Sequence, residues 1–281
     1  MNFHHIRSVD LQLLDAPTHF VKSLQKTGFA VLHQHPIDMD LVNEVYSMWN
    51  IFFNSSEKYS YLFHTEKQDG YFPFKSENAK GSDEKDLKEF FHIYPWGRCP
   101  DLLETKTRQL YDQLVELACQ LLNWIEKEVP TEISSNFSIP LEKMIDDSPR
   151  NLLRIINYPS LSGNEKPNAV RAAAHEDINL ITVLCAGTES GLQAQDMNGS
   201  WHDIECDPGS IAVNTGDMLQ MCSNNYFPST THRVINPKNK KMRLPRMSMP
   251  LFLHPNDNVA LSKKHTAASY LLERLQEIGL K

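Results

Sequence analysis

The sequence contains no apolar run long enough to cross a membrane. A transmembrane helix needs about 20 consecutive apolar residues, and the apolar runs of this 281-residue chain are much shorter. The stretch from Met1 to Arg7 also lacks the apolar centre of a secretion signal. We therefore expect a cytoplasmic protein that has no membrane partner.

Cysteine and basic charge are also scarce. The five cysteines are odd in number and form no Cys-x-x-Cys pair, which favours reduced thiols over a disulfide framework. The formal net charge is -7, whereas a nucleic-acid-binding surface needs clustered positive charge. The composition therefore argues against a nucleic-acid partner.

The sequence does contain enough apolar residues for one large core. Hydrophobic residues make up 41% of the chain, and the length fits either two ordinary domains or one larger β domain with helical additions. We predict a single domain over residues 1–281. It would consist of a helical support region (1–150), a β core with the functional site (151–255) and a C-terminal helix (256–281). The composition carries no signal for the oligomeric state.

Amphipathic helices are predicted mainly in the first half of the chain. Apolar residues recur at helical spacing before Gly28, over 38–53 and over 102–129, and Pro130 ends the last of these helices. A further helix is predicted over 266–280. Its expected buried stripe consists of Leu271, Leu272, Leu275 and Ile278.

The second half of the chain has the pattern of a β domain. After Pro149, short apolar and β-branched runs alternate with turns that are rich in Gly, Pro, Asn and Asp. Strands are predicted over 152–158, 178–185, 192–195, 201–204, 210–213, 232–235 and 247–253. This dense spacing of strands is typical of a sandwich or jelly roll.

A His-x-Asp pair precedes one of these β segments. His175 and Asp177 lie two positions apart, ahead of the apolar run that begins at Ile181. Because side chains alternate across a strand, residues two positions apart point the same way, as two ligands of one ion must. A second imidazole, His232, precedes another β-branched run.

Two imidazoles and one carboxylate form the facial triad of non-haem Fe(II) oxygenases, which leaves other positions on the ion open. We therefore predict that His175, Asp177 and His232 bind a metal. Zinc is the alternative ion, because His and Asp also suit it. His33 and His35 form a rival pair with the same spacing, but no motif that contains a carboxylate accompanies them.

Further short blocks follow the His-x-Asp pair in a characteristic order. They are 181–184, Gly191-Leu192-Gln193, 198–201, 214–220, 232–234 with Asn236-Pro237, and Arg246-Met247-Ser248. In these blocks and their order, the chain resembles the isopenicillin N synthase-like branch of the Fe(II)/2-oxoglutarate-dependent dioxygenases. Weaker similarity at Gly28-Phe29 and over 88–92 extends the resemblance over most of the chain.

This resemblance implies both a fold and a reaction. The fold would be α+β, mainly β, with a distorted double-stranded β-helix (jelly roll) core, N-terminal supporting helices and a C-terminal helix. The reaction would hydroxylate or desaturate a small-molecule substrate with dioxygen, while 2-oxoglutarate is converted to succinate and carbon dioxide. Fe(II) would be held by His175, Asp177 and His232.

The resemblance also implies a clamp for the carboxylate of 2-oxoglutarate. Arg246 and Ser248 lie two apart on a predicted strand, so guanidinium and hydroxyl share one face. In the family such an Arg-x-Ser pair holds the distal carboxylate of the keto acid, helped by a tyrosine before a proline. Tyr158 before Pro159 matches that tyrosine. Arg243 is a nearby alternative, but it is not followed by Ser two positions later.

Two other functions fit the same pattern. Isopenicillin N synthase itself uses no 2-oxoglutarate, so the first alternative is an iron oxidase that takes electrons from its substrate or from ascorbate. The second is a non-catalytic ligand-binding protein on the same fold. The resemblance places residues 70–74 and 89–92 beside the substrate pocket. There His92 would be either a substrate contact or an ordinary half-buried histidine.

Overall fold

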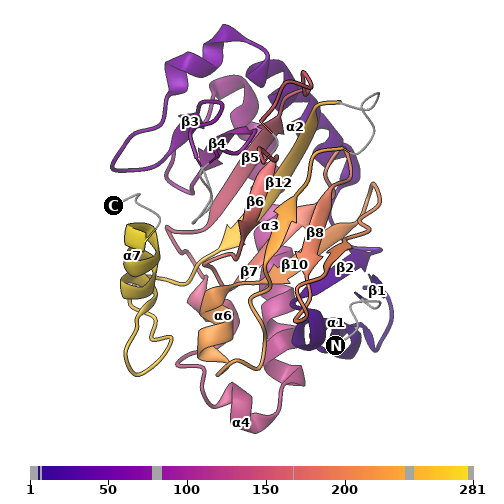
Figure 1. Cartoon of the computed structure of the whole chain (residues 1–281). Coiled ribbons are helices and arrows are strands. Elements are labelled where there is room, and N and C mark those ends of the chain that lie inside the picture. The colour runs from indigo at the N-terminus through magenta and orange to yellow at the C-terminus, as the bar shows by residue number, and fades with distance from the viewer. Residues whose placement is uncertain (1–5, 7, 78–83, 167, 238–243, 278–281) are drawn as a thin grey trace.

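Two β-sheets lie face to face at the centre of the protein, and helices cover the outer side of the larger sheet (Figure 1). The computed structural model describes residues 6, 8–77, 84–166, 168–237 and 244–277. Within these residues the larger sheet has eight strands in the order β1-β2-β10-β7-β12-β5-β4-β3, and the smaller has four in the order β6-β11-β8-β9. The predicted jelly-roll core is confirmed.

The elements have the following bounds. The strands of the larger sheet are β1 (Ser8–Asp10), β2 (Phe29–His33), β3 (Gly70–Phe72), β4 (Glu89–Ile93), β5 (Leu152–Tyr158), β7 (Ile181–Cys185), β10 (Ile211–Thr215) and β12 (Arg246–Leu253). Those of the smaller sheet are β6 (Ala172–His175), β8 (Leu192–Gln195), β9 (Trp201–Asp203) and β11 (His232–Val234). The helices are α1 (Ala16–Thr27), α2 (Met39–Phe53), the 3-10 helix η1 (Ser56–Tyr61), α3 (Asp101–Glu128), α4 (Thr131–Ser134), α5 (Leu141–Met144), α6 (Asp217–Cys222) and α7 (Ala267–Glu277).

The long helices begin and end where their terminal residues satisfy free backbone groups. The α1 helix ends at Gly28, which adopts a left-handed conformation (φ 68°) and donates its N–H to the carbonyl of Leu24. The α2 helix begins after Asp38, whose carboxylate accepts hydrogen bonds from the backbone N–H groups of Asp40 and Leu41. The helices predicted before Gly28, over 38–53 and over 102–129 are therefore confirmed.

The main hydrophobic core lies between these helices and the larger sheet. Leu110, Leu114 and Leu121 of α3 are fully buried and pack in one cluster with Met249 and Leu251 of β12. Each buried leucine contributes about 1.5–3 kcal/mol relative to an exposed one. The apolar stripe of α3 thus holds the larger sheet in place from behind.

The inner faces of the two sheets enclose a second, smaller cluster. It contains Phe29 and Phe90 from the larger sheet, with Ala194 and Val234 from the smaller one. Side chains alternate along each strand, so every second residue of β5, β7, β10 and β12 points into this interior. A functional site between the sheets is therefore built from inward-facing residues of strands that are far apart in the sequence.

The strand registers place particular residues opposite each other. In the smaller sheet β11 pairs with β6, and His232 lies opposite His175. In the larger sheet β12 pairs with β5, and Arg246 lies opposite Tyr158. The pairing of β12 with β7 puts Thr182 opposite Phe252, which lies at the other end of β12 from Arg246.

The first half of the chain contributes strands as well as helices. Strands β1 to β4 all precede residue 101 and form both edges of the larger sheet. The main core contains residues from this half and from the β region that follows. The division into support region, β core and C-terminal helix stays a prediction.

The C-terminal helix α7 forms, but its predicted buried stripe is confirmed only at Leu271, which is half-buried against the main core. Ala267 and Tyr270, in the first turn, are its buried residues, whereas Leu272 is 45% exposed. The helix is fixed at its start, because Ala267 donates its N–H to Val259 and the Tyr270 hydroxyl donates to Asp217 of α6. Ile278 lies outside the described residues.

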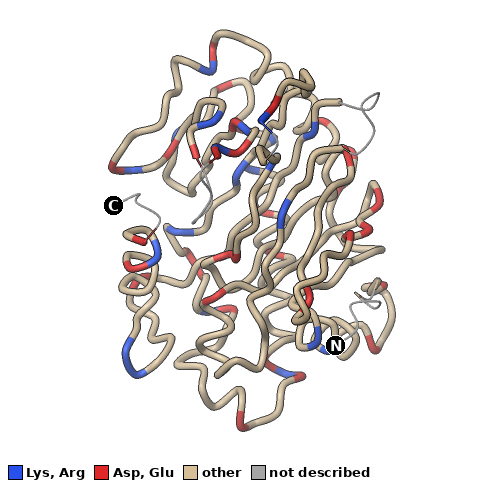
Figure 2. The backbone as a smooth tube through the Cα atoms, viewed as in Figure 1, with Lys and Arg blue, Asp and Glu red and all other residues tan. Residues whose placement is uncertain are grey.

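Charged residues of both signs lie interspersed along the chain (Figure 2). None of the helices in the described part of the chain combines the length and apolar character that a membrane crossing requires.

Candidate metal centre

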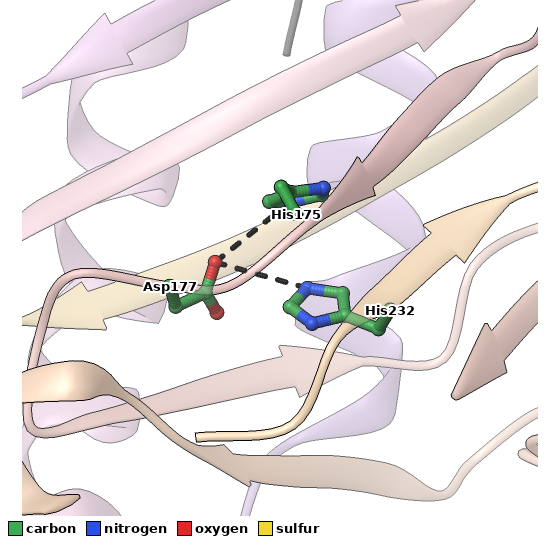
Figure 3. Close-up of side chains that lie close together, drawn as sticks. All are labelled: His175, Asp177 and His232. Carbon is green, nitrogen blue, oxygen red and sulfur yellow. Dashed lines mark ion pairs between the residues drawn. The ribbon is translucent and has the colours of Figure 1, made fainter. Parts of the chain in front are cut away.

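Three side chains from two separate parts of the chain meet at one end of the space between the sheets. His175 Nε2 lies 3.8 Å from Asp177 Oδ1, and His232 Nε2 lies 3.7 Å from the same oxygen (Figure 3). One ligand atom from each residue lies within 4.8 Å of the other two. Ligand atoms about 2.1 Å from one ion are roughly 3–4 Å apart, so a single ion fits between them.

Each of the three residues is positioned by a different local structure. His175 is the last residue of β6, and His232 is the first residue of β11, directly opposite. Asp177 lies two residues beyond the end of β6, in the turn that leads to β7. Its approach to His175 is therefore a property of this turn and not, as the spacing suggested, of alternation along one strand.

Both imidazoles are oriented by the same kind of hydrogen bond. His175 Nδ1 lies 2.8 Å from the carbonyl oxygen of Ala173, and His232 Nδ1 lies 3.0 Å from that of Thr230. A carbonyl oxygen only accepts, so each Nδ1 carries the proton and each Nε2 presents a lone pair. The ring of Phe29 packs edge-on against His232 at 5.6 Å. Binding of a metal through Nε2 needs this tautomer and a fixed ring plane.

The carboxylate of Asp177 is held by one of its two oxygens. Thr182 Oγ1 donates to Oδ2 at 2.6 Å, and Asn214 Nδ2 donates to the same atom at 2.8 Å. The amide of Asn179 donates to Thr182 Oγ1 at 2.9 Å, which directs the threonine proton towards the carboxylate. Oδ1 is left facing the two imidazoles. Sequence reasoning missed these supporting residues.

The charge states suit a divalent cation. Burial and the neighbouring His232 lower the pKa of His175 to about 4, so its imidazole is neutral at neutral pH. Burial alone would raise the pKa of Asp177, but the two histidines and the bonds from Thr182 and Asn214 outweigh it and lower that pKa. Neutral imidazoles and an ionised carboxylate are what a metal ion binds.

The donor set of two nitrogens and one oxygen matches the facial triad of non-haem Fe(II) sites, and zinc takes the same donors. Among the described residues, these three form the one group of His, Cys, Asp or Glu with metal-binding spacing. In the rival pair, His33 Nδ1 bonds to Ser210 and His35 Nε2 donates to Gly209. That pair therefore has structural partners.

The predicted carboxylate clamp lies farther along the same interior. Arg246, Ser248 and Tyr158 are 3%, 2% and 2% exposed, and the Arg246 guanidinium lies 5.2 Å from the centre of the Tyr158 ring. Arg246 Nε donates to the carbonyl of Glu189 at 2.8 Å, while its Nη1 is buried without a partner. A buried guanidinium nitrogen without a partner fits an anion-binding site.

The loop after β7 leaves room for this guanidinium. A Cβ on Gly187 would lie 2.6 Å from Arg246 Nη2, so a larger residue there would displace the arginine. The loop is therefore shaped around Arg246. The alternative anion-binding residue, Arg243, lies outside the described residues.

A second polar cluster lies between the sheets beside β4 and β5. Lys88 Nζ is 2.8 Å from Glu77 and 2.9 Å from Asp86, and Arg154 Nη1 is 3.3 Å from Glu77. His92 is buried, with Nδ1 against the carbonyl of Gln68 and Nε2 accepting from Arg154 Nε at 2.8 Å. Both ring nitrogens of His92 have protein partners, so it behaves as a buried structural histidine.

Two family models match the chain. Residues 150–255 match the 2OG-Fe(II) oxygenase superfamily. Residues 10–113 match the non-haem dioxygenase in morphine synthesis N-terminal domain. The first match contains His175, Asp177, His232 and the Arg-x-Ser pair.

Similar proteins include curated sequences and a crystal structure. A homoarginine-6-hydroxylase of Arabidopsis thaliana is 28% identical over 76% of this chain, and the matched part spans 64% of that relative's own length. A gibberellin 2-beta-dioxygenase of Pisum sativum is 26% identical over 88% of this chain and 76% of its own.

The crystal structure of a Shewanella oneidensis protein assigned as an oxygenase superposes with a TM-score of 0.89. It is 49% identical over 98% of this chain and 99% of its own. Likeness over the whole length, together with the two domain matches, shows that this chain belongs to the 2OG-Fe(II) oxygenase superfamily.

Proposed function

We propose that the protein is a non-haem Fe(II)/2-oxoglutarate-dependent dioxygenase that hydroxylates or desaturates a small molecule. The observation that carries the proposal is the geometry at Asp177. Its Oδ2 is occupied by Thr182 and Asn214, and its Oδ1 faces the free Nε2 atoms of His175 and His232. Three side chains prepared in this way on one side of an ion leave its other positions open for ligands.

The residues have distinct roles in this proposal. His175, Asp177 and His232 hold Fe(II), and Arg246, Ser248 and Tyr158 hold the distal carboxylate of 2-oxoglutarate. Bound together, iron and the keto acid supply the activation of dioxygen. The chain keeps the His175 imidazole neutral, fixes the free carboxylate oxygen and encloses the site between two sheets. Ascorbate would serve as a reductant that keeps the iron ferrous.

The proposed reaction balances without a further oxidant. For hydroxylation, the substrate C–H, dioxygen and 2-oxoglutarate give the alcohol, succinate and carbon dioxide; one oxygen atom enters each of the alcohol and succinate. The names of two relatives indicate different substrates, homoarginine and gibberellin. At 26–28% identity, neither substrate is assigned to this chain.

Anaerobic binding and aerobic turnover test the proposal separately. We expect calorimetry to detect 2-oxoglutarate binding only after Fe(II) or Mn(II) has been added. Under air, succinate should be released in the presence of Fe(II) and ascorbate, faster with a true substrate from a library. Metal binding without any 2-oxoglutarate binding would favour an oxidase instead. Tight keto-acid binding without turnover of any library member would favour a ligand-binding protein.

Substitutions of two different histidines, one a predicted metal ligand and one not, test the ligand assignment. His175→Ala should abolish metal binding while the thermal unfolding transition persists. His202→Ala removes a half-buried histidine that lies 2.9 Å from Asp196, and it should leave metal binding unchanged. Unchanged metal affinity in His175→Ala would contradict the ligand assignment.

A further inference from the structure

A second buried arginine lies next to the predicted carboxylate clamp. Arg171, just before β6, is 1% exposed and is among the largest fully buried side chains. Its Nη2 donates to the carbonyl of Leu244 at 2.5 Å, and its Nε is buried without a partner. A buried guanidinium normally has a carboxylate or a full set of acceptors. Arg171 has neither among the described residues.

Arg171 and Arg246 share a neighbour. Their guanidinium carbons lie 5.9 Å and 5.2 Å from the centre of the Tyr158 ring. The acceptor of Arg171, Leu244, lies two residues before Arg246 on the way into β12. Both cations therefore lie against the ring of Tyr158, although 75 positions separate them in the sequence.

This arrangement is electrostatically incomplete without an anion. Neither guanidinium forms an ion pair with a carboxylate of the described residues, and each has one buried nitrogen without a partner. Burial and then the charge of Arg246 lower the pKa of Arg171, against smaller opposing effects of Tyr158 and Glu189. Two buried guanidiniums without an ion-pair partner among the described residues fit a ligand group that carries a full negative charge and several acceptor lone pairs.

We propose that Arg171 is a second cationic residue of the 2-oxoglutarate site, which with Arg246 binds the distal carboxylate of the keto acid. This inference rests on the proposed function. Arg246 keeps Nη1 and Arg171 keeps Nε for the ligand, while their other bonds to backbone carbonyls hold the guanidiniums in place. The site would therefore select keto acids with a second carboxylate more strongly than a single Arg-x-Ser pair does.

The test is a cycle of two ligands and two proteins. The ligands are 2-oxoglutarate and 2-oxopentanoate, which has the same chain length and keto-acid end but no distal carboxylate. The proteins are the wild type and Arg171→Met, titrated by anaerobic calorimetry with saturating Mn(II) so that no turnover occurs. We expect the substitution to weaken 2-oxoglutarate binding about 10- to 100-fold, the range for a lost hydrogen bond to a charged group. Binding of 2-oxopentanoate should be nearly unchanged.

Arg108→Met is the matched control. Arg108 donates to the backbone carbonyls of Tyr94 and Gly97, so its loss removes similar bonds between α3 and the segment after β4. It should lower thermal stability without changing the affinity for either keto acid. If Arg171→Met does not fold, Arg171→Lys keeps the charge but not the planar donors, and a smaller, about 3- to 10-fold, selective loss is expected.

The outcomes separate this inference from the proposed function. Wild-type protein that binds metal but not 2-oxoglutarate would contradict the proposed cosubstrate itself. If the wild type binds 2-oxoglutarate and Arg171→Met binds it with the same affinity, the inference is overturned. Arg171 would then serve substrate binding or folding alone. Equal weakening of both keto acids would also overturn it, because the effect would then not depend on the distal carboxylate.

Discussion

Asp177 is the residue on which the metal centre depends most. Two of its hydrogen-bond donors come from different strands, Thr182 from β7 and Asn214 from β10. Together they keep Oδ2 occupied, so that a metal meets a single free oxygen. They also stabilise the charged form of the carboxylate, which lowers its pKa.

Removing one donor should weaken metal binding without removing a ligand. Asn214→Leu deletes the bond to Asp177 Oδ2 and places an apolar group of similar size beside the carboxylate. Loss of such a supporting contact lowers metal affinity by about 10- to 100-fold, measured by titration of Mn(II) or Co(II). Asn151→Leu is the control: Asn151 is equally buried but bonds to Ile145 and His254, so stability should fall while metal affinity does not. Equal metal affinity in both variants would show that Asn214 plays no part.

The sequence was sufficient to predict the residues that can bind the metal, but not those that support them. His175, Asp177 and His232 have side chains whose chemistry is recognisable at short spacing. Thr182 and Asn214 have ordinary polar side chains, and they reach Asp177 only because β7 and β10 pair in a particular register. That register depends on contacts between distant segments, which composition and periodicity do not encode.

At the scale of elements, the corner at Gly28 connects the N-terminal helix to the metal centre. Gly28 ends α1 and begins β2, and its carbonyl accepts the N–H of Thr215 at 3.0 Å. Thr230 donates its hydroxyl to the carbonyl of Thr27, and the carbonyl of Thr230 in turn orients His232. The corner therefore sets the position of the backbone that presents one metal ligand.

A side chain at position 28 should destabilise the fold. A Cβ on Gly28 would meet the Thr230 hydroxyl and would lie 2.7 Å from the carbonyl oxygen of Pro228, in a left-handed conformation that disfavours alanine. We expect Gly28→Ala to lower the free energy of unfolding by about 2–4 kcal/mol, from conformational strain and overpacking together. Unfolding in denaturant measures this loss of stability. Gly199 also has a positive φ, but a Cβ there would meet only Gln195 Nε2, at an ordinary contact distance of 3.8 Å. Gly199→Ala should therefore cost about 1–2 kcal/mol, and similar losses in both variants would contradict the steric argument.

Most elements could be predicted because their patterns are local. Strands β5 and β8 coincide with the apolar runs over 152–158 and 192–195, and α2 with its capped amphipathic segment. Strand β6 was not predicted, since Ala172-Ala173-Ala174 has no β-branched residue and is a strand only through pairing with β11. The exposed Leu272 of α7 has a similar cause, because tertiary contacts and not helical spacing decide which turn of a helix is buried.

For the molecule as a whole, the interior holds more charge than the metal centre requires. Glu77, Lys88, Asp86 and Arg154 form a network that links the segment before β4 to β5. Burial opposes ionisation of Glu77, but Arg154 and Lys88 outweigh it and lower its pKa far below the usual value. The same carboxylate, with Asp86, raises the pKa of Lys88 against its burial. Folding therefore depends on Glu77 being ionised.

The stability of the protein should consequently fall in acid through this network. A depressed pKa in the folded state means that the contribution of Glu77 to stability is complete above its unfolded pKa of about 4.3 and is lost as the pH falls below that value.

Glu77→Gln should lower the free energy of unfolding by about 1–3 kcal/mol at pH 7. The difference in this free energy between the wild type and the variant should narrow between about pH 5 and pH 3. Other carboxylates titrate in both proteins, so the difference between the two unfolding curves reports Glu77 together with the groups coupled to it, including His92. Glu44→Gln, which breaks an exposed pair with Lys106, should change stability by less than about 1 kcal/mol at any pH. A gap for Glu77→Gln that stays constant over this range would mean that its carboxylate contributes no pH-dependent stability.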